Sequence, residues 1–205
     1  AFAFNYNYQI PIGILSDTYG NNSAIGASYF LEKSNNVIFG IEGSYIFGNN
    51  IKDSTIFENI TTSTGNIIGA DGKYANINLM QRGCDAHIFV GYAFHSSKNN
   101  LSGIYISQGI GYLQHQIFID TKNENVPQLN ENMKKGYDYF SNGISTKFAI
   151  DYKFYHKKGR FQISSGFNYT MAYTKNQRLY DFKNQEYYNR LRKWDKLLGF
   201  KIEVI

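Results

Sequence analysis

The sequence is poor in several features that define common classes of protein. Its 205 residues include one cysteine and two prolines, and charged residues make up only 18% of the chain. The single Cys84 excludes an intramolecular disulfide and a cysteine-based metal cluster. No run approaches the roughly 18 consecutive apolar residues of a membrane-spanning helix. The shortage of charge argues against an ordinary soluble domain, because about a quarter of the residues of such domains are charged.

Aromatic residues and regular alternation are abundant instead. The chain holds 18 tyrosines and 16 phenylalanines. Disorder is excluded, because a chain this rich in aromatic residues buries ample apolar surface. Apolar residues recur at every second position in four long stretches, which is the period of a β-strand and not of a helix. These stretches are 4–14, 144–154, 161–173 and 198–204.

The alternation, extended to the whole chain, predicts eight strands whose connections alternate between short and long. Several strands reach the roughly 9–11 residues that cross a membrane at a tilt. Short and long connections then fall on opposite rims, as in outer-membrane barrels with short periplasmic turns and long extracellular loops. The predicted strands are 4–15, 23–32, 37–48, 77–94, 101–119, 141–155, 160–174 and 196–205. The expected short turns are 33–36, 95–100 and 156–159, and the expected long segments are 16–22, 49–76, 120–140 and 175–195.

We therefore predict an all-β fold, with residues 1–205 forming a single eight-stranded antiparallel up-and-down transmembrane β-barrel. The main rival is a soluble eight-stranded barrel of the lipocalin type, which also alternates. The polar face favours the membrane barrel, since it consists of Gly, Ser, Asn, Thr and Ala with scattered charges. A soluble barrel would present a face dense in Lys and Glu. The Phe, Tyr and Ile face is then expected to contact lipid, and the expected location is the cell outer membrane.

Six segments carry a resemblance to a known class of protein. They are GSYIFG (43–48), QRG (81–83), GIGYLQHQI (109–117), KKGYDYFSNG (134–143), NQRLYDF (176–182) and KLLGF (196–200). With these segments the sequence resembles the small eight-stranded outer-membrane barrels, and more narrowly those of Bacteroidota that accompany secretion or assembly machinery. The resemblance covers nearly the whole chain and implies the barrel architecture. It leaves the function open, because this fold carries adhesins, enzymes, structural proteins and subunits of secretion machines.

No constellation of residues predicts catalysis. A barrel enzyme that trims or transfers acyl chains needs a nucleophilic serine beside a histidine that a carboxylate orients. The only adjacent pair is His95-Ser96-Ser97, which falls in an expected short turn with no acidic residue nearby in sequence. A glycine-rich phosphate loop is absent from the sequence as well. We therefore predict a non-enzymatic protein without a cofactor.

A metal site is not expected, because the histidines do not converge. His87 and His115 flank the expected turn at 95–100. Strand pairing about that turn sets His87 opposite Gln108 and His115 opposite Met80, which separates the two imidazoles along the barrel. Metal binding requires ligands that meet at one point. Both histidines are predicted to be hydrogen-bonded residues of the interior.

Charged residues at the polar positions of the strands are predicted to face the lumen. A carboxylate and an ammonium in a closed, poorly hydrated lumen must pair, because an isolated charge there is costly. Asp151 and Lys153 are neighbours on one face and within reach of each other. Eight strands leave little room for an ion path, so a structural plug is the favoured interpretation. The predicted lumen network is Glu42, Asp85, His87, Lys147, Asp151, Lys153, Lys201 and Glu203.

The segment 175–196 concentrates positive charge. It holds seven Lys and Arg against three Asp and Glu, with aromatic residues between them. This mixture also suits nucleic acid, but on an exterior rim lipopolysaccharide phosphate or an acidic protein surface fits better. A solvated loop with aromatic residues at its base is the alternative interpretation. The predicted contact residues are Arg178, Tyr180, Lys183, Arg190, Arg192, Lys193 and Trp194.

Two short patterns stand out in the long segment 49–76. Asp53-Ser54-Thr55 resembles the acidic-hydroxyl motif that Bacteroidota O-glycosylate on exported proteins, with Ser54 as the acceptor, and a pattern of three residues also arises by chance. Asp71-Gly72 is a tight-turn dipeptide. It predicts a hairpin within this segment.

Together these features favour an accessory or structural subunit of an outer-membrane complex for secretion or assembly. Its loops and lipid-facing wall are expected to dock other outer-membrane proteins, with outer-membrane lipid and lipopolysaccharide as further partners and no nucleic acid. A surface adhesin or a lipopolysaccharide-binding barrel is the alternative function. A lipid-modifying enzyme is a third, and it requires Ser and His side chains to converge near the outer-leaflet rim.

Overall fold

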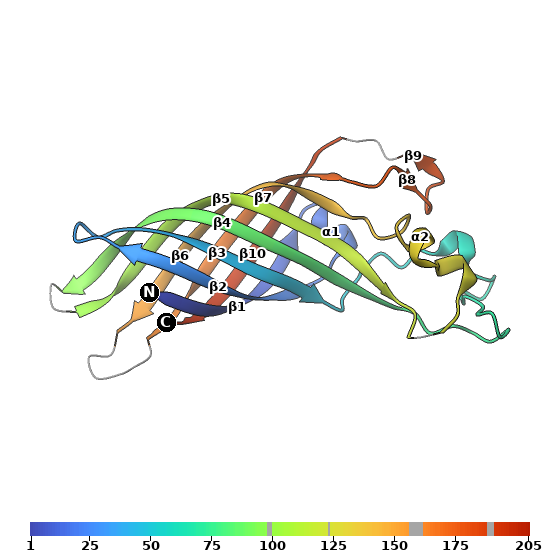
Figure 1. The fold of residues 1–205 in the computed structure, drawn as a ribbon, viewed down its shortest axis with the longest axis horizontal. Helices are drawn as coiled ribbons and strands as arrows, with labels where there is room; N and C mark the ends of the chain where they lie inside the picture. Colours follow the sequence, from blue (N-terminus) through green and yellow to red (C-terminus); the bar gives the residue numbers. More distant parts are fainter. Residues whose placement is uncertain (98–99, 123, 156–161, 188–190) are drawn as a thin grey trace.

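Eight long strands close into an antiparallel barrel in which each strand pairs with its neighbours along the chain (Figure 1). The structure is a computed structural model that describes residues 1–97, 100–122, 124–155, 162–187 and 191–205. The first and last strands close the ring by pairing Phe4 with Val204 through to Ile12 with Lys196. The predicted eight-stranded up-and-down barrel is thus confirmed. Its strands are β1 (Phe2–Ile12), β2 (Asn22–Glu32), β3 (Val37–Gly48), β4 (Asn78–Ser97), β5 (Asn100–Asp120), β6 (Ser141–Phe154), β7 (Ile163–Asn176) and β10 (Lys193–Val204).

The two ends of the barrel differ as the connection lengths predict. Both chain termini lie toward the end with the short turns, and the long loops gather at the other end (Figure 1). Within the described residues, no helix is both long enough and apolar enough to cross a membrane. The loops carry the short elements α1 (Leu15–Thr18), η1 (Glu58–Ile60), η2 (Pro127–Leu129), α2 (Glu131–Lys134), β8 (Tyr180–Asp181) and β9 (Glu186–Tyr187).

The turns agree with the sequence in part. The turn at 33–36 is confirmed, with the backbone N–H of Asn36 donating to the carbonyl of Lys33. The expected turn at 156–159 lies outside the described residues. β1 ends at Ile12 and not at residue 15, because Gly13 has a φ of +67° and turns the chain into α1. In the loop 49–77, Gly72 has a φ of +77° and a β-bridge joins Ile68 to Tyr74, so the predicted hairpin is confirmed.

The connection between β4 and β5 is tighter than predicted, and this changes their register. β4 continues to Ser97 and β5 begins at Asn100. His87 therefore lies opposite Gly111, and not opposite Gln108. His115 lies opposite Gly83, and not opposite Met80. Gly83, the partner of His115, lies four residues before His87 on β4. The two histidines therefore remain at different levels of the barrel.

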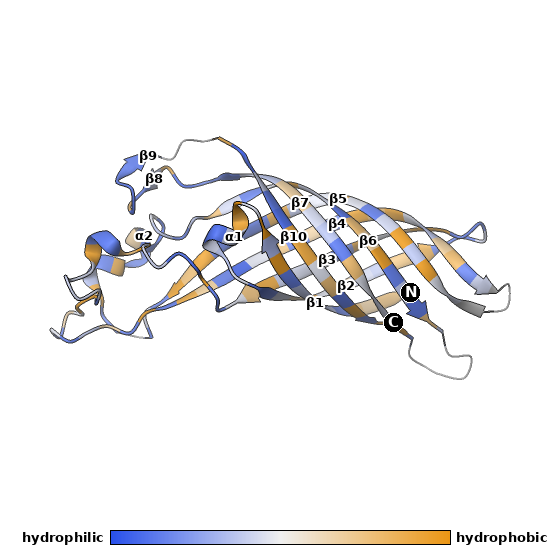
Figure 2. Ribbon diagram, turned by 180° about the vertical axis from the view of Figure 1, so that it is seen from behind, coloured by the Kyte–Doolittle hydropathy of each residue, from blue (hydrophilic) through white to orange (hydrophobic). Residues whose placement is uncertain are grey.

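Each strand presents one polar and one apolar face, which appears as alternating bands along the strands in Figure 2. Ile110 on β5 and Ile144 on β6 are both 69% exposed on the outside. Gly109 and Ser145, which alternate with them on the inner face, are buried. A shift of one residue would exchange the two faces, so this alternation fixes which side chains line the lumen.

The interior contains an apolar part at the loop end and a polar part in its middle. The apolar part, here called the apolar plug, joins inward side chains of the strands to side chains of the loops. The loops thus fold back onto the barrel and share a core with it, which removes their apolar surface from solvent. The plug consists of Leu15, Tyr19, Ala24, Ile46, Ile56, Ile67, Leu113, Ile117, Ile119, Val126, Leu129, Tyr137, Ala172 and Leu197.

Candidate functional site

An ion cluster built from three strands occupies the middle of the lumen. Lys147 on β6 places its Nζ 2.9 Å from Oε1 of Glu42 on β3 and 3.1 Å from Oδ2 of Asp85 on β4. The hydroxyl of Ser44 donates a 2.6 Å hydrogen bond to Oδ1 of Asp85. One buried ammonium therefore serves two carboxylates, and the hydrogen bonds offset part of the cost of removing these charges from water.

His87 lies beside this cluster and is held by a hydroxyl. Its Nε2 is 2.8 Å from the Oγ of Ser145 on β6. Its Nδ1 lies farther from the carboxylates, at 3.9 Å from Glu42 and 3.8 Å from Asp85. Within the described residues, no group of three or more His, Cys, Asp or Glu side chains is placed to hold a metal ion. The imidazole thus belongs to the polar packing of the lumen.

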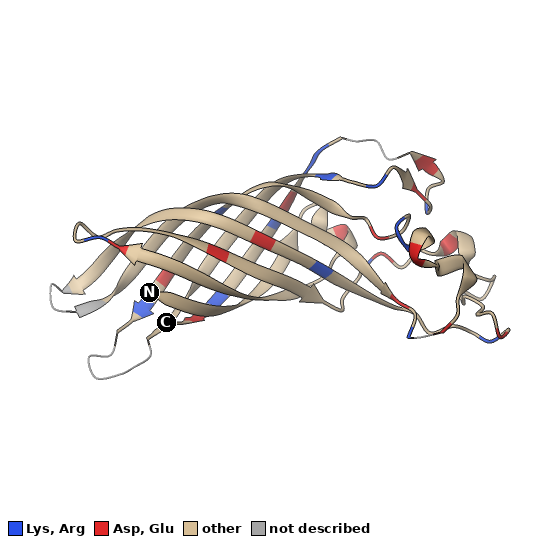
Figure 3. Cartoon of the chain, in the orientation of Figure 1, with Lys and Arg blue, Asp and Glu red and all other residues tan. Residues whose placement is uncertain are grey.

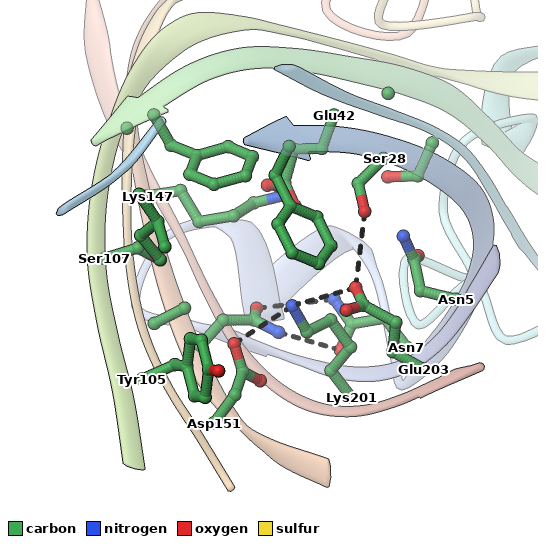
Figure 4. Close-up of a pocket in the computed structure, with 18 of the residues that line it drawn as sticks. Asn5, Asn7, Ser28, Glu42, Tyr105, Ser107, Lys147, Asp151, Lys201 and Glu203 are labelled. Carbon is green, nitrogen blue, oxygen red and sulfur yellow. Dashed lines mark hydrogen bonds and ion pairs between the residues drawn. The ribbon is translucent and has the colours of Figure 1, made fainter. Parts of the chain in front are cut away.

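A second ion cluster lies nearer the short-turn end, where Lys201 stands between two carboxylates (Figure 4). Its Nζ is 3.1 Å from Oδ2 of Asp151 and 3.5 Å from Oε2 of Glu203. The expected pairing of Asp151 with Lys153 is wrong. The ammonium of Lys153 instead lies 3.6 Å from the ring centroid of Phe30 and 4.4 Å from that of Tyr105. The narrow lumen lets Lys201 reach Asp151, and the two aromatic faces attract the ammonium of Lys153.

A small cavity of about 40 Å³ separates the two ion clusters. A space of about 10–15 Å³ holds one water molecule, so this cavity has room for a few waters. The apolar plug occupies the barrel between the cavity and the loops, and residues such as Leu113 and Ile117 in it are almost wholly buried. The interior that the structure describes is therefore filled by side chains, and we interpret the ion clusters as part of that filling.

A polar cluster that the sequence did not predict adjoins the apolar plug. Nε2 of His115 on β5 lies 2.8 Å from Oδ2 of Asp195, and the hydroxyl of Thr174 donates to the same oxygen at 2.5 Å. The hydroxyl of Tyr19 lies 3.3 Å from Nδ1 of His115. A strand that begins at residue 196, as the sequence predicts, leaves Asp195 in the basic loop. β10 begins at Lys193, so Asp195 shares the buried inner face with Leu197.

Two ion pairs tie the long loops together above the plug. Arg178 donates from Nε to Oδ1 of Asp138 at 2.8 Å, and its Nη2 also contacts that carboxylate. Nζ of Lys183 lies 2.8 Å from Oδ2 of Asp53, whose carboxylate also accepts a hydrogen bond from the hydroxyl of Tyr139. We call these five residues the loop cap. Arg178 and Lys183 thus both bind carboxylates of neighbouring loops, and their expected role as partner contacts stays a prediction.

Acid is expected to open the loop cap at Asp53. Burial alone raises the pKa of Asp53, but hydrogen bonds from Lys183 and Thr55 outweigh it, and the net pKa is below its ordinary value. A carboxyl with a depressed pKa stabilises the fold fully above its unfolded pKa, near about 4, and this contribution is lost as pH falls through the lower folded value. Amide exchange in 177–187, corrected for its intrinsic pH dependence, should therefore accelerate below about pH 4.

Asp53→Asn is the matched variant for this prediction, because it removes the charge without changing the shape. It should show the fast exchange of the acidic state already near neutral pH, since Lys183 then has no carboxylate at this position. Equal protection of 177–187 in the variant and the wild type would show that the ion pair does not hold the loop. The neighbouring Ser54 is exposed, and its O-glycosylation stays a prediction.

The other predicted contact residues divide between the inside and the outside of the barrel. Lys193 lies 4.0 Å from Oδ1 of the buried Asp195. Tyr180 packs edge-on against Tyr187 within the β8–β9 hairpin. Trp194 and Arg192 belong to the outside, where both contact Tyr173. Arg190 lies outside the described residues.

The serine–histidine pair lies at the end of β4, where a register shift interrupts the pairing with β5. Nε2 of His95 lies 2.6 Å from Oε1 of Glu32, so a carboxylate that the sequence placed far away does adjoin this histidine. Glu32 also accepts a hydrogen bond from Tyr105. Ser96 is exposed, whereas the imidazole of His95 is largely buried against Glu32.

A groove crosses the outer wall over β2, β3 and β4. Ala27, Gly43 and Ala86 lie side by side in register on these strands. Their small side chains leave a hollow of about 690 Å³ between taller neighbours. The tall residues that border it are Phe2, Tyr29, Ile41, Ile88, Ile110, Tyr112 and Ile144.

A polar pair interrupts the apolar wall beside this groove. Gln108 on β5 is exposed on the outer face, and its amide nitrogen donates a hydrogen bond to the hydroxyl of Thr146 on β6. The hydroxyl of Thr146 donates in turn to the carbonyl of Gly109 at 3.0 Å. No described residue donates a hydrogen bond to the side-chain carbonyl of Gln108. The residues opposite Gln108 on the adjacent strands are the apolar Val90 and Phe148.

Several solved structures resemble the chain. No family model matches it. No curated protein matches it either. Among solved structures it is similar to the crystal structure of Neisserial surface protein A (NspA), at 12% sequence identity and a TM-score of 0.47, over 99% of this chain and 94% of that one. The barrel fold itself rests on the eight strand ladders of this chain.

Proposed function

We propose that this chain is a non-enzymatic outer-membrane β-barrel with its short turns in the periplasm and its long loops outside the cell. The exposed apolar belt supports this location, because Ile88, Ile110 and Ile144 would face water in a soluble barrel and face lipid in a membrane. Acidic and basic residues are few along the barrel strands and gather in the loops (Figure 3). This distribution fits a bilayer around the strands and water around the loops.

The proposed role is that of an accessory or structural subunit of an outer-membrane protein complex, of the kind that secretion or assembly machinery forms. Because side chains fill the lumen, the outer surface is the part of the molecule that can bind a partner. The observation that carries this role is the pair of Gln108 and Thr146 beside the groove. An amide carbonyl without a donor costs about 1–3 kcal/mol when buried in an apolar environment. A partner protein that donates to it removes this cost, and a lipid acyl chain does not.

The groove supplies the shape that such a partner needs. Ala27, Gly43 and Ala86 let another backbone approach the wall closely, as small residues do where proteins pack within membranes. The polar pair then fixes the register of the contact, because a hydrogen bond is directional. We propose that the partner is another outer-membrane protein with an apolar wall and one outward hydrogen-bond donor.

Filling the groove is expected to release the partner without unfolding the barrel. Ala86→Phe places a large ring in the hollow, on the outer face, where the lumen is not disturbed. The co-purifying partner should fall by about tenfold, which corresponds to about 1.4 kcal/mol of binding free energy. The measurement is mild-detergent purification from native membranes followed by native gel electrophoresis. Ser165→Phe is the matched control, since Ser165 is exposed on the outer face of β7, away from the groove.

A cross-link from Cys84 identifies the neighbour directly. Cys84 is the single cysteine of the chain and is exposed on the outer face of β4, two residues before Ala86. A photoactivated cross-linker on this thiol should capture one protein in wild-type membranes and lose it in Ala86→Phe. A chain that migrates alone under every condition, with no cross-linked product, would contradict the proposed role.

A further inference from the structure

Two aromatic residues in contact with each other mark the outer wall of β7 and β10 at the loop end of the barrel. Tyr173 and Trp194 are opposite each other in the strand ladder. Their ring centroids are 4.8 Å apart at an interplanar angle of 34°. The side chains are 41% and 50% exposed, so their faces and edges are open to the surroundings of the barrel. Aromatic residues at this height suit the boundary between hydrocarbon and headgroups.

Three cations surround this aromatic pair on the same face. The guanidinium of Arg192 lies 5.3 Å from the ring centroid of Tyr173. Lys175 follows Tyr173 by two positions on β7, and Lys196 follows Trp194 by two positions on β10. Since side chains two positions apart share a face of a strand, both lysines point outward with the rings. We call these five residues the rim patch.

The charge of the rim patch is not neutralised by the part of the protein that the structure describes. No described carboxylate lies within 4.0 Å of the charged atoms of Lys175, Arg192 or Lys196. The inward cations of the same stretch are different, because Lys183 binds Asp53 and Lys193 approaches Asp195. The nearby carboxylates therefore lie beside the inward cations, and the outer wall keeps an excess of three positive charges.

The position of the rim patch along the barrel axis indicates which molecules can contact it. Below Lys196, the outer face of β10 continues with Leu198, Phe200, Ile202 and Val204, which belong to the apolar belt. Above Arg192 lies the loop that carries β8 and β9. The patch therefore stands at the rim where lipid headgroups lie if the belt is embedded in the membrane. Long cationic side chains at this height extend toward the headgroups while their stems remain in the apolar layer.

We propose that the rim patch binds the phosphates of a phosphorylated glycolipid in the outer leaflet. This inference rests on the proposed outer-membrane location and is independent of partner docking at the groove. Arg192 suits two-point recognition of a phosphate, and the two lysines add point charges on either side. Tyr173 and Trp194 offer ring surfaces for the sugar and their polar edges for hydrogen bonds. A lipid with phosphates on a sugar headgroup matches both the cations and the aromatic rings of the rim patch.

Native mass spectrometry of the folded barrel in detergent tests this proposal with defined probes. They are bisphosphorylated lipid A, the same lipid without its phosphates, phosphatidylglycerol and inorganic phosphate. The wild type should prefer the bisphosphorylated lipid over the dephosphorylated one by on the order of 100-fold, since each surface cation contributes about a fivefold gain. The triple variant K175Q, R192Q and K196Q should bind both lipid A forms equally.

Arg82 provides the matched control. It is an outward cation near the loop end of β4, on another wall, and it lies 5.9 Å from the ring centroid of Phe118. Arg82→Gln removes a comparable charge and should leave lipid A binding unchanged. Higher ionic strength should weaken binding in the wild type and not in the triple variant, because screening acts on exposed charges.

Four results would overturn the glycolipid assignment. They are equal wild-type binding of both lipid A forms, equal binding of phosphatidylglycerol and lipid A, displacement of the lipid by equimolar inorganic phosphate, and an effect of R82Q equal to that of the triple variant. Failure of the barrel to insert into vesicles would instead contradict the outer-membrane location. Loss of the partner in native membranes would bear on the groove alone.

Discussion

Replacing Lys147 with methionine is expected to destabilise the barrel by about 3–5 kcal/mol, the usual cost of removing one partner from a buried ion pair. The ammonium of Lys147 lies within 3.1 Å of oxygens of both Glu42 and Asp85. Without it, two carboxylates face each other beside a cavity of about 40 Å³. The few waters that such a cavity holds carry no charge, so the carboxylates remain poorly compensated.

The measurement is urea unfolding in lipid vesicles, followed by the fluorescence of Trp194, the single tryptophan of the chain. The matched control combines Lys147→Met with Glu42→Gln and Asp85→Asn, which removes all three charges and nearly keeps the volume. This variant should recover most of the lost stability, because an uncharged cluster needs no counterion. If the single and the triple variant unfold at the same urea concentration, the ion cluster does not stabilise the barrel through charge pairing.

The strands could be predicted from the sequence because their signal is local. Along β6, exposed Ile144 and Ile150 alternate with buried Ser145 and Ala149, and the printed sequence already shows this period of two. The face of each lumen residue follows from the same period. The alternation does not predict the partner across the lumen, which depends on how far the strands slide as the ring closes. Lys201 therefore reaches Asp151, although Lys153 is nearer to it in sequence.

The loops could not be predicted in the same way, because their contacts join distant positions without a period. Arg178 binds a carboxylate 40 positions before it, and Lys183 binds one 130 positions before it. Apolar loop residues such as Tyr137 and Phe182 pack against each other beside these pairs, with ring centroids 5.5 Å apart. An interpretation of the segment 175–196 as one basic surface does not separate two kinds of cation. Arg178 and Lys183 bind carboxylates of other loops, whereas the cations of the rim patch lie on the outer wall.

Arginine in the apolar belt is expected to cost about 2–4 kcal/mol, the penalty for a cation near mid-depth on the lipid face of a membrane barrel. Ile150→Arg is the variant of choice. Ile150 is 44% exposed on the outer face of β6, and the residues opposite it are Ile106 on β5 and Phe167 on β7. A guanidinium there has apolar neighbours on both sides and lipid in front, so its charge has no partner within the wall.

Urea unfolding in vesicles, compared with Asn132→Arg on the exposed helix α2, measures this penalty. The loop variant should leave stability unchanged, because its side chain meets water in the folded and the unfolded state. Ala149→Lys is informative beside them, since Ala149 lines the lumen cavity together with Asp151 and Glu203. An added ammonium there meets carboxylates, so its cost is steric and its electrostatic part is smaller than at position 150. If Ile150→Arg and Asn132→Arg are tolerated equally, this face of β6 does not contact lipid, and the alternative of a soluble barrel is favoured.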